Sequence, residues 1–129
     1  AKLLADDFPN TLIILNHAGL PYDRSIKGLR NWRNKINIIS QCPNVIVKIS
    51  GIGVPNSTWN KLNNEGIINY LIEKFGADRC MFGSNFPVDS LCASYDQIVE
   101  TLFECISSLT KTEIKNIFYN NALKFYKPL

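Results

Sequence analysis

Short apolar segments alternate with longer amphipathic stretches along this chain, and this order limits the possible folds more than any other feature. The apolar segments occupy 11–16, 45–49 and 80–83. Each is short and bounded by turn residues, which predicts β-strands. Strands separated by helical stretches build a parallel sheet covered by helices, so the predicted fold class is α/β. The nearly unbroken apolar run at 11–16 predicts a first strand that is buried on both faces.

The stretches between the strands predict amphipathic helices. In the first stretch, apolar residues recur three or four positions apart and form one stripe, which consists of Leu29, Trp32, Ile36 and Ile39. The second helix follows a long loop that contains Gly51 and Gly53, and its apolar residues lie between 67 and 75. Gly76 comes next, where a left-handed helix cap needs no Cβ.

Two capping-box patterns predict where the last helices begin. Ser94 is followed by Gln97, and Thr110 by Glu113. In such pairs the side chains satisfy free amides of the first helical turn. The residues expected to face inward from these helices are Ile98, Leu102, Ile106, Ile114, Ile117, Phe118 and Leu123.

Three parallel strands leave two open sheet edges, which a complete domain normally avoids. We therefore expect residues 1–129 to form one structural unit that belongs to a larger β/α barrel. Residues 3–8 read as the end of a helix ahead of any strand, so we expect the N-terminal half of the barrel to be absent. An open flavodoxin-like sheet is the structural alternative, but no glycine-rich phosphate loop follows any predicted strand.

Composition and charge exclude several functional classes. With 46% apolar and 19% charged residues, the chain has the composition of a globular protein. Its net charge of +3 is scattered, which argues against a nucleic-acid partner. No apolar run approaches the roughly 20 residues of a membrane span, and the first residues do not form a signal peptide. We expect a cytoplasmic protein with a small-molecule substrate and no membrane partner; a homo-oligomer is compatible with the sequence.

The cysteines do not indicate a metal centre. The four of them form no CxxC pair, and the chain has one histidine. Such a set is a poor zinc site. We expect reduced, partly buried thiols at Cys42, Cys80, Cys92 and Cys105.

Polar residues follow all three predicted strands, and the carboxyl ends of parallel strands form the rim that carries active sites in barrels. These residues are His17, Ser50 and Asn85. On the second strand the wholly apolar face should meet the helices, so that Lys48 and Ser50 point toward the barrel interior. A lysine there needs a carboxylate or a ligand, because an unpaired buried charge is costly. A structural ion pair and a substrate-binding role both stay open for Lys48.

His17 is the strongest catalytic candidate. Imidazole can act as a general base, a hydrogen-bond donor or a metal ligand near neutral pH. Its place at a strand end, before a Gly-Leu-Pro turn, favours function over a structural role. Asn85 and Asp89 bracket a turn that contains Pro87. Turn capping and function are equally open for Asp89.

Several motifs together resemble the amidohydrolase-related, metal-dependent hydrolases of the TIM-barrel type, specifically the branch of sugar lactonases and dicarboxylate lactonases. They are NHAGLP at 16–21, VKISG at 47–51, FGADRCMFGSNFPVD at 75–89, and Asn121-Ala122 ahead of Phe125-Tyr126. The resemblance spans nearly the whole chain and implies the C-terminal portion of a (β/α)8 TIM barrel. It also implies that the HxH pair of the family lies in an N-terminal half that this chain does not contain.

The resemblance implies roles for individual residues. His17 matches a histidine that the family uses at the metal or the substrate, and Ser50 follows a strand that forms another wall of the site. Many members carry Gly-Ser-Asp-Trp-Pro where this chain has GSNFP at 83–87, so Asn85 replaces a carboxylate. An amide cannot be a general base and is a weaker metal ligand, which argues against the divalent zinc ion that the family implies for the intact protein. Asp89 could supply the lost charge.

We hypothesise that the intact protein hydrolyses a lactone of a sugar acid or of a small carboxylic acid. His17 and Asp89 would be catalytic, and His17 would be the metal ligand if an ion is bound. The expected substrate-binding residues are Lys48, Ser50, Ser84 and Asn85. A metal-dependent decarboxylase or amidase on the same barrel and a non-catalytic binding remnant are the alternatives.

Overall fold

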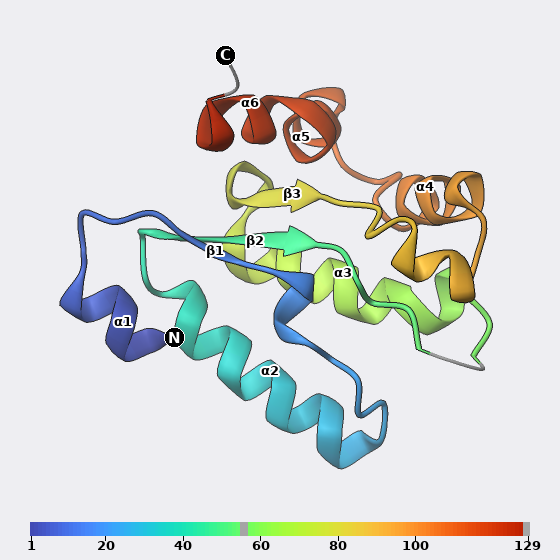
Figure 1. The fold of residues 1–129 in the computed structure, drawn as a ribbon, viewed down its shortest axis with the longest axis horizontal. Coiled ribbons are helices and arrows are strands. Elements are labelled where there is room, and N and C mark those ends of the chain that lie inside the picture. The colour runs from blue at the N-terminus through green and yellow to red at the C-terminus, as the bar shows by residue number, and fades with distance from the viewer. Residues whose placement is uncertain (55–56, 128–129) are drawn as a thin grey trace.

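Three strands form one parallel sheet, and they pair in the order in which they occur along the chain. The computed structural model describes residues 1–54 and 57–127. In the sheet order β1-β2-β3, β1 spans Ile13–Leu15, β2 spans Val45–Ile49 and β3 spans Cys80–Phe82. A helix lies between each strand and the next, as the alternating sequence pattern predicts (Figure 1).

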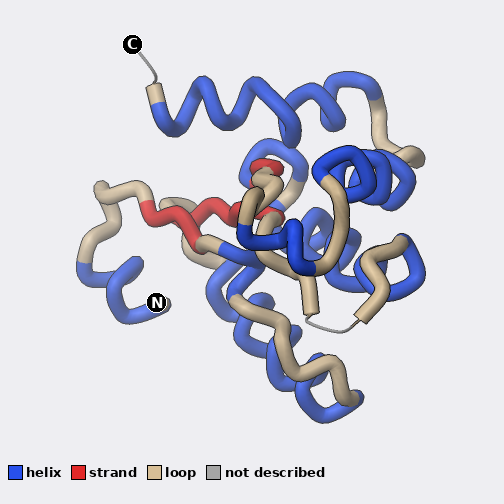
Figure 2. The backbone as a smooth tube through the Cα atoms, turned by 45° about the vertical axis from the view of Figure 1, so that its right-hand side comes forward, coloured by secondary structure: helices blue, strands red, loops and turns tan. Residues whose placement is uncertain are grey.

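Helices make up most of the described chain, as Figure 2 shows in blue. In Figure 1, α2 and α3 lie on one side of the strands, whereas α5 and α6 lie beyond β3. Short turns lie at His17–Gly19, Ala77–Arg79 and Val88–Leu91, and Asn116–Asn120 (η4) is π-helical. The α-helices are α1 (Lys2–Asp7), α2 (Ile26–Ser40), α3 (Lys61–Phe75), α4 (Tyr95–Cys105), α5 (Lys111–Lys115) and α6 (Asn121–Tyr126). None of the helices in the described ranges combines the length and the apolar character needed to cross a membrane.

The core lies between β2 and the helices that cover it. Val45, Val47 and Ile49 are all buried in one apolar cluster, which confirms the prediction that this face of β2 meets the helices. The cluster also contains the predicted inward residues of the helices, Trp32, Ile36, Ile39, Ile67, Ile68, Leu71, Phe75, Ile98, Leu102, Ile106 and Ile117. Burial of each large aliphatic side chain contributes about 1.5–3 kcal/mol to stability, so this face anchors the sheet.

The first and third strands are shorter than predicted. β1 is limited to three residues, and all three are only partly buried, so the prediction of burial on both faces is wrong. The reason is that β1 pairs with β2 alone among the described residues, which leaves its other edge without a neighbour. β3 ends at Phe82, although the amide of Gly83 still donates to the carbonyl of Ile49 at 3.1 Å.

Two helix ends differ from the predicted capping. Gly76 follows α3 with φ +75° and ψ +155°, so its φ is positive as expected but the cap is not left-handed helical. The Ser94 side chain accepts from the Gln97 amide, yet the Gln97 side chain donates to the Trp59 carbonyl at 3.0 Å and does not return to Ser94. By contrast, the box of Thr110 and Glu113 is complete.

The last helical segment contains a π turn that changes which residues face the core. Leu123 is 43% exposed, so its predicted inward orientation is wrong, whereas Asn121 is buried. A π turn holds one extra residue, which rotates everything after it by about 100° relative to a continuous α-helix. Nδ2 of Asn121 donates to the carbonyls of Ala77 and Cys80 at 2.7 and 2.8 Å, which ties α6 to the start of β3.

Candidate active site

A left-handed turn follows β1 and carries the single histidine. His17, Ala18, Gly19 and Leu20 have φ values of +51°, +53°, +66° and +60°. Such a conformation costs roughly 1–2 kcal/mol for each non-glycine residue, so the surrounding structure must hold it. The amide of Leu20 donates to the His17 carbonyl at 2.7 Å, and the indole nitrogen of Trp32 donates to the buried Ala18 carbonyl at 2.8 Å.

This turn places the imidazole ring against the end of β2. Nδ1 of His17 lies 3.1 Å from Oγ of Ser50. Gly51 makes room for the ring: its φ is +55°, and a Cβ added there would lie 2.5 Å from Nδ1 of His17. Two of the three predicted rim residues therefore form a hydrogen-bonded pair.

Lys48 and Ser50 share one face of the sheet, as strand alternation predicts. A Cβ added to Gly83 would lie 3.0 Å from Cδ of Lys48 and 3.1 Å from Cβ of Ser50, so both side chains pass over Gly83. Nζ of Lys48 lies 5.7 Å from the centre of the Tyr126 ring. No carboxylate of the described residues forms an ion pair with Lys48, so the structural ion pair that the sequence left open is not formed there.

Asn85 and Asp89 form the second polar pair of the rim. Nδ2 of Asn85 donates to Oδ1 of Asp89 at 2.9 Å, and Asn85 itself has a positive φ of +56°. Asp89 is only 5% exposed, and its Oδ2 is buried without a hydrogen-bond partner among the described residues. Oγ of Ser84 accepts from the Phe86 amide at 3.2 Å, so its observed contact is within the turn.

A pocket of about 300 Å³ joins the loop after β2 to the loop after β3. Asn85 and Asp89 line it together with Gly51, the residue that contacts the His17 ring. The other four predicted site residues, His17, Lys48, Ser50 and Ser84, are not among its walls, although the His17 ring lies against Gly51. The structure therefore brings the predicted residues to one rim but not into one cavity.

The pocket also contains residues that sequence reasoning missed. Tyr22 and Cys92 line it, and a Cβ added to Gly53 would lie 2.9 Å from Sγ of Cys92 and 3.4 Å from Cγ of Asp89. Burial and the nearby Asp89 carboxylate raise the pKa of the Cys92 thiol above its ordinary value. Tyr22 and Cys92 belong to no sequence motif. The sequence pointed to this part of the pocket only through the two glycines of the loop after β2, Gly51 and Gly53.

The predicted zinc ligand, His17, belongs to no complete metal site among the described residues. The described residues contain no group of three histidine, cysteine, aspartate or glutamate side chains that could hold a metal ion. A catalytic zinc site normally has three protein ligands and one open position. His17 and the free Oδ2 of Asp89 are therefore too few donors to form such a site by themselves.

Comparison with known sequences gives consistent matches. A family model described as Amidohydrolase matches residues 1–127. Protein y4mH of Sinorhizobium fredii is 40% identical over 124 residues, which are 96% of this chain and 41% of that protein. An L-fucono-1,5-lactonase of Burkholderia multivorans is 33% identical over an alignment of 126 positions that covers 88% of this chain and 42% of the lactonase. The chain thus spans less than half the length of both relatives.

Comparison with solved structures shows the same fold. The crystal structure of an amidohydrolase of Burkholderia multivorans with bound HEPES superimposes with a TM-score of 0.88 at 26% identity, covering 99% of this chain and 48% of the other. A second crystal form of that protein, with bound zinc, gives a TM-score of 0.88 at 25% identity. This chain therefore has the fold of about half of a TIM-barrel amidohydrolase, which confirms the predicted fold class.

Proposed function

The chain belongs to the amidohydrolase family, whose model matches residues 1–127, and from this premise we propose that the protein containing it hydrolyses a lactone of a sugar acid or of a small carboxylic acid. The 33% identity to an L-fucono-1,5-lactonase supports this class of substrate. Hydrolysis of an ester ring needs a base for water, donors for the carbonyl oxygen and a proton for the leaving alkoxide. The chain offers residues for each task.

The hydrogen bond between His17 and Ser50 carries the proposal. With the Nδ1 proton donated to Oγ of Ser50, the opposite nitrogen of the ring keeps a free lone pair that can accept a proton from water. The hydroxyl oxygen of that water attacks the lactone carbonyl, and the bond between the carbonyl carbon and the ring oxygen breaks. His17 then returns the proton to the ring oxygen, which leaves as an alcohol group of the hydroxy acid.

Substrate binding is assigned to the residues around this pair. Lys48 has no carboxylate partner among the described residues, so its ammonium group is available to a carbonyl or carboxylate oxygen of the substrate. The free Oδ2 of Asp89 can accept a hydrogen bond from a substrate hydroxyl, or serve as a second base, while Asn85 holds the other oxygen in place. Asn85 and Ser84 offer neutral polar groups to the ring of the substrate.

A divalent zinc ion remains part of the proposal for the whole protein. The crystal structure with bound zinc supports it. Such an ion would polarise the carbonyl and activate water, but it would need ligands from outside the described residues, and a ring nitrogen of His17 that bound it could not at the same time accept the water proton. We therefore assign no step of the reaction to a metal.

The test uses the longest natural protein that contains this chain. The His17→Asn variant should lose at least 99% of its turnover on a panel of sugar lactones and dicarboxylate lactones, because the amide cannot accept the water proton. Unchanged turnover would remove His17 from the mechanism. Wild-type protein that opens none of the lactones but releases carbon dioxide or ammonia from carboxylic acids or amides would favour the decarboxylase or amidase alternative.

A further inference from the structure

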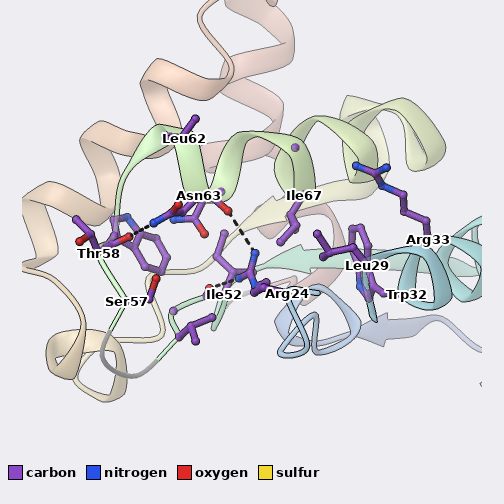
Figure 3. Close-up of a pocket in the computed structure, with 15 residues that line it drawn as sticks. Arg24, Leu29, Trp32, Arg33, Ile52, Ser57, Thr58, Leu62, Asn63 and Ile67 are labelled. Atoms are coloured by element: carbon purple, nitrogen blue, oxygen red, sulfur yellow. Dashed lines mark hydrogen bonds between the residues drawn. The ribbon is translucent and has the colours of Figure 1, made fainter. Parts of the chain in front are cut away.

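A second pocket of about 300 Å³ lies between α2 and α3, next to the loop that follows β2 (Figure 3). Gly53 and Val54 line this pocket and also line the one at Asp89, so the loop separates the two cavities. None of the residues assigned to catalysis or substrate binding belongs to its walls. Its function is therefore a separate question from the proposed hydrolysis.

The charges around this second pocket are all positive. Arg24 and Arg33 line it, and none of the described lining residues is acidic. The first turn of the 15-residue helix α3 also faces it through Asn63 and Asn64. The lining thus favours an anion over a neutral or cationic ligand.

Arg24 occupies the centre of this wall without a counter-ion. Its Nη2 donates to the Ile52 carbonyl at 2.6 Å, and its Nη1 lies 3.4 Å from the Asn63 carbonyl, as the dashed lines in Figure 3 show. Its Nε is buried and has no partner among the described residues. Burial lowers the pKa of the guanidinium group, which reflects the cost of a charge that no carboxylate compensates. The two carbonyls fix the position of the Arg24 guanidinium group and leave some of its N–H donors free.

Trp59 supplies a second unused donor. Its side chain lines the pocket, is only 5% exposed, and has an indole nitrogen with no partner among the described residues. A buried donor that is left unpaired costs roughly 1–3 kcal/mol. The other tryptophan, Trp32, also lines the pocket but donates to the Ala18 carbonyl. The two indole groups therefore differ in whether their nitrogen has a hydrogen-bond partner among the described residues.

We propose that this pocket binds a small organic carboxylate. The carboxylate oxygens accept hydrogen bonds from the Nη donors of Arg24 that the two carbonyls leave free, and the apolar part of the ligand contacts Leu29, Ile67 and the ring of Trp59. An anion there would compensate the charge of Arg24, for which the described residues supply no carboxylate partner. This inference does not depend on lactone hydrolysis, since it rests on other residues.

Titration of the indole signals tests the inference. The longest natural protein that contains this chain is labelled with ¹⁵N-tryptophan, and the signals are assigned from the Trp59→Phe and Trp32→Phe variants. Propionate is added, with propionamide as a neutral control of the same shape and inorganic phosphate as a second anion. We expect propionate to move the Trp59 signal saturably, to leave the Trp32 signal in place, and to do so more strongly than either control.

Substitutions then identify the partner of the anion. Arg24→Gln should weaken propionate binding at least tenfold, while Arg30→Gln, an exposed arginine outside the pocket, should leave it unchanged. Arg24→Lys keeps the charge but loses the planar guanidinium group with its paired donors, so it should bind propionate severalfold more weakly. This variant tests the role of Arg24 if Arg24→Gln does not fold. A Trp59 signal that ignores propionate, a response to phosphate alone, equal responses to propionamide, or full binding by the Arg24 variants would each overturn the proposal.

Discussion

Nδ1 of His17 lies 3.1 Å from Oγ of Ser50, although the two residues are 33 positions apart in the chain. They meet because β1 and β2 are parallel neighbours that end at the same edge of the sheet. The turn after β1 is left-handed, and Gly51 has no side chain in the space that the ring occupies. The contact therefore depends on backbone conformation as much as on the two side chains.

Removal of the Ser50 hydroxyl should impair the proposed reaction without disrupting the fold. We expect Ser50→Ala to lower kcat roughly five- to tenfold, because one hydrogen bond of about 1 kcal/mol no longer orients the imidazole ring. Steady-state kinetics on the best lactone measures the effect. Ser107→Ala is the matched control, since that hydroxyl donates to the Glu104 carbonyl on an exposed helix end. Equal losses in both variants would contradict a role for Ser50.

Gly51 should be essential for activity as well as for local conformation. A methyl group at Gly51 would lie 2.5 Å from Nδ1 of His17, so Gly51→Ala should displace the ring and remove most of the turnover. Gly76→Ala is the control, because Gly76 also has a positive φ but its added Cβ would meet nothing within 4 Å. Both variants should lose about 1–3 kcal/mol of stability from backbone strain, measured by urea unfolding. Activity that survives in Gly51→Ala would show that the ring can move harmlessly.

Asn121 should be one of the most sensitive positions for stability. Asn121→Ala removes the side-chain donor to the buried carbonyls of Ala77 and Cys80, of which only the Ala77 carbonyl keeps another partner among the described residues, the Cys80 amide. We expect a loss of about 2 kcal/mol or more in the free energy of unfolding. Asn120→Ala removes only a bond to the partly buried Asn116 side chain and should cost under about 1 kcal/mol. Chemical unfolding curves of the two variants compare them directly, and similar midpoints would contradict the anchoring role of Asn121.

The thiol of Cys92 should report on the charge of Asp89. Burial and, as the smaller cause, the Asp89 carboxylate raise the pKa of this thiol, so Asp89→Asn should remove part of that increase and raise the thiolate fraction at pH 8. We expect Cys92 to react severalfold faster with a disulfide reagent in that variant. Asp7→Asn, on the exposed face of α1, should leave the rate unchanged.

The other cysteines provide the background for this measurement. Burial raises the pKa of Cys80 to about 12 and that of Cys105 to about 11, so both stay protonated at pH 8. Cys42 is also buried. A rate in Asp89→Asn that equals the wild-type rate would show that the carboxylate does not act on the Cys92 thiol.

The periodicity of the sequence predicted the elements that are regular. Strand alternation placed Lys48 and Ser50 on one face, because a period of two is a strong constraint on a buried strand. The same reasoning wrongly predicted that Leu123 faces the core. A helical pattern of 3.6 residues per turn assumes a continuous α-helix, but a π turn precedes Leu123 and shifts the faces of the residues after it. Asn121 took the buried position through hydrogen bonds to carbonyls that are remote in sequence.

The site was also predicted only in part, because the sequence shows where strands end but not how turns and loops fold. Residues at strand ends could be found because the end of a strand is visible in the sequence, as with His17 and Asn85. The left-handed turn at 17–20 could not, because only one of its residues is glycine. Arg24 and Trp59 belong to different loops with ordinary composition, and their shared pocket arises only when α2 packs beside α3.

The agreement between chain order and strand order has a consequence for synthesis on the ribosome. Each strand of the sheet docks on the one made just before it, β2 on β1 and β3 on β2. A nascent chain with this topology can add one βα unit at a time to a growing template and need not wait for a distant partner strand. Once a nascent chain has emerged from the ribosome through α3, β1 and β2 should therefore already be paired, with their apolar face covered by α2 and α3.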